Sequence, residues 1–250
     1  MKVNTVIIGA GISGLSAAHF LSKKTNDFVV LESANKIGGI LQTISKENFI
    51  CENGPNTVLL NNEAIIELIK DCGLWKDIIH PTNKSNKNRF VLHQNIITNI
   101  PTKIYGFITT PLLSLNSKFR VIRELFIKKH KQNTTVYNFI NKRFGREFHD
   151  QLIEPFLTGI YAGDTKKMSA QHSLKLLWKL EQKHGSVIKG LIKKKGPPID
   201  AFNLPNGLSE LISKIAFPIK DNIKMDYNVK QIIKDNLGYK IISDSESIKC

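Results

Sequence analysis

The 250-residue sequence, with 41% hydrophobic and 23% charged residues, can bury a full core in one large domain or two small ones. Its three cysteines, Cys51, Cys72 and Cys250, form neither a CxxC pair nor a metal-ligand cluster, which argues against a disulfide scaffold and predicts no metal site. The formal charge of +15 is almost all lysine, as an AT-rich genome produces, and without interleaved aromatic residues it argues against nucleic-acid binding but not against a membrane surface or an acidic small molecule.

Residues 1–20 resemble a secretory signal peptide, because one lysine precedes an apolar run. However, Asn4, Ser13 and Ser16 interrupt that run, three glycines stand in it at fixed spacing, and no small-residue cleavage site precedes a polar start. No apolar run reaches the roughly 18 residues that a membrane-spanning helix needs. We therefore expect a cytoplasmic protein.

The first elements form a strand, a glycine turn, a helix and a second strand. The β-branched run 3–8 predicts a buried parallel strand, and small and apolar residues at helical spacing predict a helix over 12–22. A second strand is predicted over 28–31 and ends at Glu32. The turn between the first strand and the helix, 9–14, matches G-x-G-x-x-G in the βαβ context that a dinucleotide site requires.

Each glycine of this pattern has a physical role. Gly9 permits the tight turn, Gly11 lets a pyrophosphate approach the backbone, and Gly14 lets the helix pack closely on the strand. The helix N-terminus attracts phosphate, and Glu32 can accept hydrogen bonds from a ribose diol. A glycine-rich turn without a ligand is the alternative. The predicted cofactor-binding residues in this segment are Gly9, Ala10, Gly11, Ile12, Ser13, Gly14, Glu32 and Ser33.

Two further glycine segments distinguish FAD from NAD. An acidic residue followed closely by Gly38-Gly39 resembles the FAD-dependent amine oxidase and desaturase superfamily, in which this loop runs beside the flavin. Residues 52–56, ENGPN, resemble the E-x-G-P segment of the same superfamily, where small residues let the backbone pass close to the flavin ring. The order of these segments favours FAD, with Gly38, Gly39, Gly54, Pro55 and Asn56 as further binding residues.

The sequence predicts mainly helices in the middle of the chain. A helix over 61–72 precedes a hairpin of 89–92 and 96–100. The segment 105–129 mixes bulky apolar residues with basic ones, so it fits either a peripheral membrane contact or an amphipathic helix pair that covers a core. The remaining predicted elements are helices over 136–144, 147–153, 170–183, 186–194 and 206–216, strands over 223–234 and 239–243, an irregular turn over 159–169 and a linker over 193–198.

The run 154–190, EPFLTGIYAGDTKKMSAQHSLKLLWKLEQKHGSVIKG, closely resembles a segment of oxygen-dependent protoporphyrinogen oxidases and their coproporphyrinogen relatives. GAGISGL, ENGPNT, Asn88-Arg89-Phe90 and Leu204-Pro205-Asn206-Gly207-Leu208 occur in the order of that family. The resemblance implies removal of six electrons from a porphyrinogen in heme biosynthesis. A flavin takes a hydride three times, and O2 reoxidises it to give H2O2.

The resemblance also implies roles for single residues. Arg89 matches an arginine that pairs with a substrate propionate, a task for which a guanidinium suits a carboxylate better than lysine does. Val229 matches the position whose backbone meets the FAD adenine. Gln42 stands where some members have a second arginine, so a carboxylate contact there would be weaker. Gly159 and Gly163 are expected to allow close helix packing, and Trp178 and Tyr161 are expected in the core.

The implied fold is α/β: a Rossmann-like FAD-binding domain (GR2-type) with an inserted, mainly helical domain for substrate and membrane contact. We expect its first part over 1–88, the insertion over 89–198 and the return over 199–250. Family members are nearly twice as long, so the chain is expected to be a truncated, inactive amino half. Another FAD-dependent oxidase acting on amines or carotenoids, or a non-catalytic FAD-binding remnant, are the alternatives. The resemblance leaves three points open: whether the substrate is protoporphyrinogen or coproporphyrinogen, whether the protein contacts a membrane surface, and whether it forms a homodimer.

Overall fold

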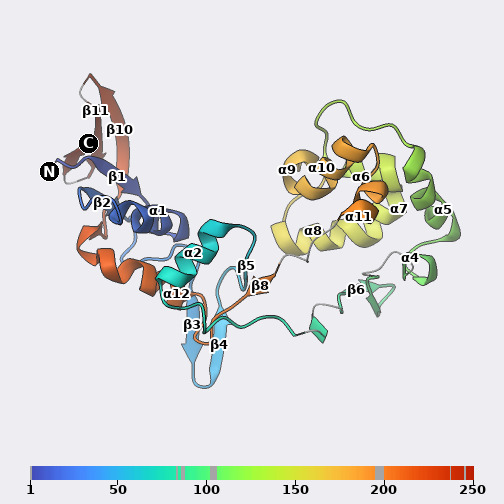
Figure 1. Ribbon diagram of the computed structural model, residues 1–250, viewed down its shortest axis with the longest axis horizontal. Coiled ribbons are helices and arrows are strands. Elements are labelled where there is room, and N and C mark those ends of the chain that lie inside the picture. Colours follow the sequence, from blue (N-terminus) through green and yellow to red (C-terminus); the bar gives the residue numbers. More distant parts are fainter. Residues whose placement is uncertain are drawn as a thin grey trace. The chain divides into compact units, whose positions relative to one another are not determined.

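A computed structural model of the chain describes residues 2–82, 84–85, 88–101, 106–194, 200–236, 238–244 and 246–250 (Figure 1). The chain forms two compact units. Unit 1 comprises Met1–Pro81 and Pro198–Cys250, and unit 2 comprises Thr82–Pro197. Most of the predicted linker, 195–198, lies outside the described residues.

A three-stranded parallel sheet is the centre of unit 1. Its order is β1 (Thr5–Ile8), β2 (Phe28–Leu31) and β9 (Ile223–Lys224), and Thr5 pairs with Phe28 and Ile8 with Leu31. All four residues of β2 are buried, as a continuous apolar run in a covered parallel strand should be. Helix α1 (Ile12–Ser22) connects β1 to β2, so the predicted βαβ unit and the α/β class are confirmed.

Unit 1 contains further sheets and helices. A second, antiparallel sheet contains β10 (Val229–Asp235), β11 (Gly238–Ser243) and β12 (Ser247–Lys249), so the single strand predicted over 223–234 is in fact β9 and β10. The other elements are β3 (Thr43–Lys46), β4 (Phe49–Glu52), β5 (Val58–Leu59), α2 (Glu63–Asp71), β8 (Ala201–Phe202), α12 (Ser209–Ala216) and the 3-10 segment η3 (Phe217–Asn222).

The core of unit 1 joins segments from both ends of the chain. Leu15 and Ala18 of α1 are completely buried in one cluster with Val30 of β2, Ile69 of α2 and Ile215 of α12. Because α1 and α12 are 187 or more positions apart in the sequence, the second segment of unit 1 completes the core that the first segment begins. Burial of apolar surface at this shared cluster therefore stabilises the two segments together.

The described part of unit 2 contains one hairpin and a set of short helices. The hairpin pairs β6 (Phe90–His93) with β7 (Ile96–Asn99), as predicted. The helical elements are α4 (Gly106–Thr109), α5 (Leu115–Arg123), η1 (Glu124–Phe126), α6 (Val136–Phe144), α7 (Arg146–Phe148), the π-helical η2 (His149–Ile153), α8 (Glu154–Tyr161), α9 (Ala170–Ser173), α10 (Lys175–His184) and α11 (Val187–Lys193).

The segment predicted as an irregular turn, 159–169, begins inside helix α8. This helix continues to Tyr161 and ends at Ala162, which has a left-handed conformation with φ +48°. Tyr161 is 54% exposed, so its prediction as a core residue is wrong, whereas Trp178 packs against the core of the unit. A Cβ at Gly159 meets no described atom within 4 Å, so the predicted close packing is absent there, and one at Gly163 would lie 2.9 Å from Met168 Sδ, the flexible end of a side chain that can move.

A buried ionic network connects the helices of unit 2. The Arg143 guanidinium on α6 donates to the carboxylates of Glu124 and Glu181, and the side chains of all three residues are fully buried. Glu124 also accepts from the Ser186 hydroxyl and from the Val187 N–H at 2.8 Å, while Arg143 Nη2 donates to the Gly185 carbonyl at 3.2 Å. In the sequence run 181–187, Glu181 and Gly185 therefore accept hydrogen bonds from the buried Arg143 guanidinium, and Ser186 donates to the buried Glu124 carboxylate.

Removal of Arg143 should unfold unit 2 far more readily than removal of an exposed arginine. Arg143→Met leaves two buried carboxylates without their guanidinium, so we expect the free energy of unfolding to fall by about 3–5 kcal/mol. The matched control is Arg146→Met, whose pair with Asp150 has side-chain exposures of 78% and 42% and should contribute less than about 1 kcal/mol. Urea unfolding of the two variants checks this, and equal losses would contradict it.

Candidate functional site

The glycine turn between β1 and α1 has the geometry that a diphosphate site needs. Gly9 has φ +95°, and a Cβ at Gly14 would lie only 1.9 Å from the Gly9 carbonyl oxygen, so both positions require glycine. A Cβ at Gly11 meets no described atom within 4 Å, which leaves open space beside the backbone. No described side chain caps α1 at Gly11, so the first N–H groups of the helix are available to an anion.

Glu32 is bound to the same turn. The Ala10 N–H donates to Glu32 Oε2 at 2.7 Å, and the Ala34 N–H donates to Oε1 at 2.9 Å. Partial burial acts to raise the pKa of Glu32, but hydrogen bonds from Ala34, Ala10 and Ser33 outweigh it and hold the pKa below its ordinary value. The side chain is thus an ionised acceptor, and the remaining lone pairs of its oxygens can accept hydroxyl groups.

The Gly38-Gly39 loop lies against the glycine turn. The Gly38 N–H donates to the Ala10 carbonyl at 2.8 Å, and a Cβ at Gly39 would lie 3.4 Å from the Gly11 Cα. Both glycines have positive φ, +104° and +56°. The Gln42 amide closes the loop by donating to the Ile37 carbonyl at 2.9 Å and to the Gly39 carbonyl at 3.2 Å. Gln42 therefore positions this backbone, a role that its sequence position did not reveal.

The segment 53–56 lies beside the Gly38-Gly39 loop. The Asn53 N–H donates to the Gln42 carbonyl at 2.7 Å, and a Cβ at Gly54 would lie 2.1 Å from the Ile40 carbonyl oxygen. Pro55 and Asn56 are exposed, and the Asn56 carbonyl accepts from Asn203 Nδ2 at 2.8 Å. The structure therefore brings three separate glycine segments and Glu32 together on unit 1.

Val229 begins strand β10 and packs, partly buried, against a cluster that includes Val29 and Leu31. The chain just before it is attached to Glu32, because the Tyr227 N–H donates to the Glu32 carbonyl at 2.8 Å. The Asp226 N–H likewise donates to the Ala34 carbonyl at 3.2 Å. These two bonds place the start of β10 next to the end of β2.

Arg89 belongs to unit 2 and comes directly before β6. Its side chain is exposed, and its carbonyl oxygen accepts from the Ile100 N–H at 2.6 Å, which closes the hairpin. The predicted substrate residue and the predicted cofactor residues therefore lie in different units.

The two units differ strongly in charge. Unit 2 contains 22 of the 36 Lys and Arg residues but 6 of the 21 Asp and Glu residues, for a formal charge of +16. Unit 1 contains the other 14 basic and 15 acidic residues, for a formal charge of −1. An anionic partner would therefore be attracted by unit 2.

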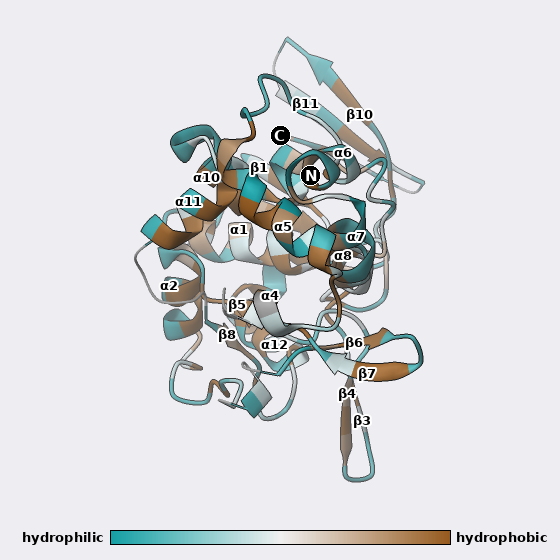
Figure 2. Ribbon diagram, turned by 90° about the vertical axis from the view of Figure 1, so that its right-hand side faces the viewer, coloured by the Kyte–Doolittle hydropathy of each residue, from teal (hydrophilic) through white to brown (hydrophobic). Residues whose placement is uncertain are grey.

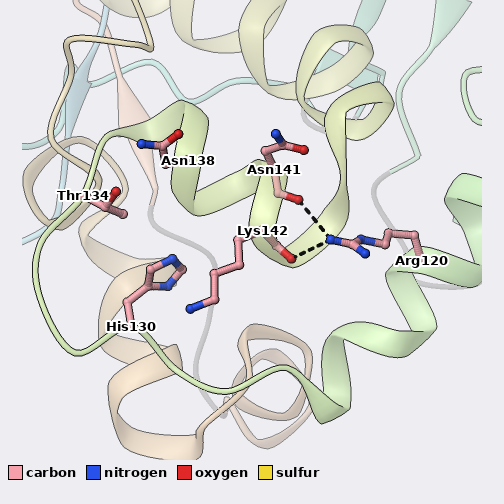
Figure 3. Close-up of a pocket in the computed structure, with 6 residues that line it drawn as sticks. All are labelled: Arg120, His130, Thr134, Asn138, Asn141 and Lys142. Atoms are coloured by element: carbon pink, nitrogen blue, oxygen red, sulfur yellow. Dashed lines mark hydrogen bonds between the residues drawn. The ribbon is translucent and has the colours of Figure 1, made fainter.

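A cavity of about 470 Å³ in unit 2 is lined by basic and neutral polar side chains (Figure 3). Arg120 Nη2 donates to the carbonyls of Asn141 at 3.4 Å and Lys142 at 3.0 Å, so this arginine caps the last turn of α6. His130 binds Glu181 at 2.7 Å through Nδ1. The lining residues are Arg120, His130, Thr134, Asn138, Asn141 and Lys142, none of which was predicted to bind a ligand.

Unit 2 also exposes apolar side chains. Leu115, Phe119, Ile122 and Phe126 follow one another at helical spacing on α5 and η1 and are between 57% and 84% exposed. The hairpin of β6 and β7 is hydrophobic along much of β7 (Figure 2). Among the described residues, no helix is both long and apolar enough to cross a bilayer.

The chain is similar in sequence to one protein family and to individual members of known function. A family model described as flavin containing amine oxidoreductase matches residues 12–250. The chain is 34% identical over 242 residues to coproporphyrinogen III oxidase of Bacillus subtilis (strain 168), covering 88% of this chain and 52% of that protein. It is 32% identical over 197 residues to protoporphyrinogen oxidase 2, chloroplastic/mitochondrial, of Arabidopsis thaliana, covering 76% of this chain and 38% of that protein.

A solved structure is also similar. The protein, from Exiguobacterium sp. 255-15, is provisionally assigned as a protoporphyrinogen oxidase, and the match has a TM-score of 0.80 at 25% identity. It covers 99% of this chain and 57% of that chain. The chain thus spans about half the length of the curated relatives it matches.

The hydrogen bonds of Glu32 should make stability depend on pH. Because its folded pKa is lowered, its carboxylate stabilises the protein above the ordinary value of 4.5, and this contribution disappears as the pH falls through the folded pKa. Glu32→Gln should therefore unfold at lower urea concentration than wild type at neutral pH, with a difference that shrinks in acid. Glu47→Gln, at the exposed turn between β3 and β4, is the control. A Glu32→Gln deficit that stays constant with pH would contradict the assignment.

Proposed function

The chain belongs to the flavin-containing amine oxidoreductase family, and we propose on that premise that it oxidises a porphyrinogen to the porphyrin. FAD is the cofactor of the family. The observation that carries the proposal is the convergence of three glycine segments and an ionised Glu32 at one place on unit 1, in a chain whose relatives are named coproporphyrinogen and protoporphyrinogen oxidases. The overall reaction removes six electrons, which three O2 molecules take up as three H2O2.

Each part of the FAD would have its own residues on this chain. The N–H groups after Gly11 would hold the pyrophosphate, Glu32 would accept the ribose hydroxyls, and Val229 would lie beside the adenine. The backbones of Gly38-Gly39 and Gly54-Pro55-Asn56 would border the ring. Bound FAD would accept the electrons of the substrate. The residues named here would orient the FAD, and the glycines among them would keep side chains away from the faces of its ring.

Unit 2 would bind the substrate. A porphyrinogen carries two or four propionates. A unit with a formal charge of +16 would attract such an anion by long-range electrostatics, without a specific contact. Arg89 would provide a specific contact, since its guanidinium can form two parallel hydrogen bonds to one carboxylate. We further propose that the apolar stripe of α5, with basic residues on the same helix, rests on the inner face of the cell membrane, which cosedimentation with anionic vesicles would test.

Gly11→Ala should separate cofactor binding from folding. The added methyl meets no described protein atom within 4 Å, so stability should change by less than about 1 kcal/mol, but it occupies the space through which the pyrophosphate approaches. We expect FAD affinity to fall by at least about tenfold. The control is Gly159→Ala, which also meets no described atom within 4 Å and should bind FAD as wild type does.

Flavin absorbance that coelutes with the protein on gel filtration, followed by a fluorescence titration, measures both variants. A colourless wild-type protein in the presence of excess FAD would contradict the cofactor site. Unchanged affinity in Gly11→Ala would place the pyrophosphate elsewhere.

The substrate assignment is tested by porphyrin fluorescence. At the length of its curated relatives, the FAD-loaded protein in air should make coproporphyrinogen III or protoporphyrinogen IX fluoresce as the ring aromatises, and a side-by-side assay would decide between them. Arg89→Ala should raise KM by about tenfold, because a charged hydrogen bond to a propionate is lost, while flavin content stays constant. Arg123→Ala, an exposed arginine on α5, is the control. Flavin binding without any rise in fluorescence would count against porphyrinogen oxidation.

A further inference from the structure

The segment Glu52–Asn56 is held at both ends by the sequence motif around Leu204-Pro205-Asn206-Gly207-Leu208. Glu52 ends strand β4, and its carboxylate accepts from the Leu208 N–H at 2.8 Å, directly before helix α12. At the other end, Asn203 Nδ2 donates to the Asn56 carbonyl at 2.8 Å. These two bonds span 156 and 147 positions of sequence, so one short stretch of the second chain segment determines where a short stretch of the first one lies.

Glu52 makes a second set of contacts that leaves it little freedom. The Thr43 hydroxyl donates to Glu52 Oε2 at 2.8 Å. Thr43 in turn exchanges two hydrogen bonds with Ser209, from the Thr43 N–H at 2.7 Å and from the Ser209 N–H at 2.9 Å. Gly207 has φ +82°, and a Cβ there would lie 2.2 Å from Thr43 Cγ2 and 2.9 Å from Glu52 Oε1. Only glycine at this position allows the carboxylate to reach the helix N-terminus.

The residues between the two ends are the ones that touch the Gly38-Gly39 loop. The Asn53 N–H binds the Gln42 carbonyl at 2.7 Å, and Gly54 lies against the Ile40 carbonyl with no room for a side chain. Helix α12 borders the same loop, because a Cβ at Gly38 would lie 3.3 Å from Ile212 Cγ2. A displacement of Glu52 would therefore shift Gly54 relative to Gly38 and Gly39.

We propose that Glu52 is a positioning residue for the flavin ring: by anchoring β4 to the start of α12, it sets the separation between Gly38-Gly39 and Gly54-Pro55-Asn56. This inference rests on the proposed function. The anchor is electrostatically favourable, since an anionic side chain stabilises a helix N-terminus. A purely structural role would change only the stability of unit 1, whereas a positioning role also changes the environment of the bound flavin.

The test compares FAD binding in wild type, Glu52→Ala, Glu52→Gln and the control Glu47→Gln in the full chain. Glu52→Ala removes both acceptors and should weaken FAD binding by about tenfold and shift the visible absorption spectrum of the bound flavin. Glu52→Gln retains one carbonyl oxygen for the Leu208 N–H and should recover most of the affinity. Glu47→Gln should match wild type in affinity and spectrum.

The outcomes distinguish this inference from the proposed function. A wild-type protein that binds no FAD overturns both. If wild type binds FAD and Glu52→Ala has the same dissociation constant and spectrum, the positioning role is refuted while the cofactor site stands. If Glu52→Ala does not fold, Asn203→Ala decides, because it releases the other end of the same segment: a weakened, spectrally shifted flavin supports the inference and an unchanged one refutes it.

Discussion

Around the candidate site, unit 1 depends on close contacts at Gly14, Gly54 and Gly207, where two stretches of backbone, or a backbone and a side chain, come closer than a methyl group would permit. Added Cβ atoms would lie 1.9 Å from the Gly9 oxygen at Gly14, 2.1 Å from the Ile40 oxygen at Gly54 and 2.2 Å from Thr43 Cγ2 at Gly207. The first contact places α1 on β1, the second places the chain after β4 on the Gly38-Gly39 loop, and the third places α12 on the β3–β4 hairpin. Together they create a surface made of backbone, to which a flat, phosphate-bearing ligand can approach closely.

Unit 2 is organised by a different interaction. Its helices are short, and its buried residues include Arg143 with two carboxylates as well as an apolar cluster around Val136, Phe139 and Ile140. Charges in such a position are costly unless every donor and acceptor is matched, so the network specifies one arrangement of these helices more strictly than apolar packing would. The run 181–187 is part of the segment 154–190 that resembles porphyrinogen oxidases, and it supplies Glu181, the Gly185 carbonyl, the Ser186 hydroxyl and the Val187 N–H to this network.

The sequence predicted local structure well where periodicity and glycine spacing coincide. The helix 12–22 and the strand 28–31 were predicted with the bounds that the structure shows. The β3–β4 hairpin was not predicted, because its turn at Glu47 takes a positive φ of +54° without a glycine to indicate it. Helix α8 runs through Gly159 because its end is determined by Ala162. The bonds of Glu52 to Leu208, of Asn203 to Asn56 and of Arg143 to Glu124 could not be read from the sequence, since they join residues 156, 147 and 19 positions apart. The roles of the cofactor residues and of Arg89 stay predictions.

The contrast in charge between the units comes from their arginines and acidic residues rather than from their lysines. Lysine is spread over both, with 14 in unit 1 and 17 in unit 2, so the abundance of lysine is common to the whole chain. Unit 2 differs in holding all five arginines and only 6 of the 21 acidic residues. Its cations repel one another, and dissolved ions weaken that repulsion over distances beyond about 10 Å at 0.1 M salt. Ionic strength therefore affects the stability of the two units differently. Low ionic strength destabilises the helical unit 2, in which like charges repel, and leaves the nearly neutral unit 1 unaffected.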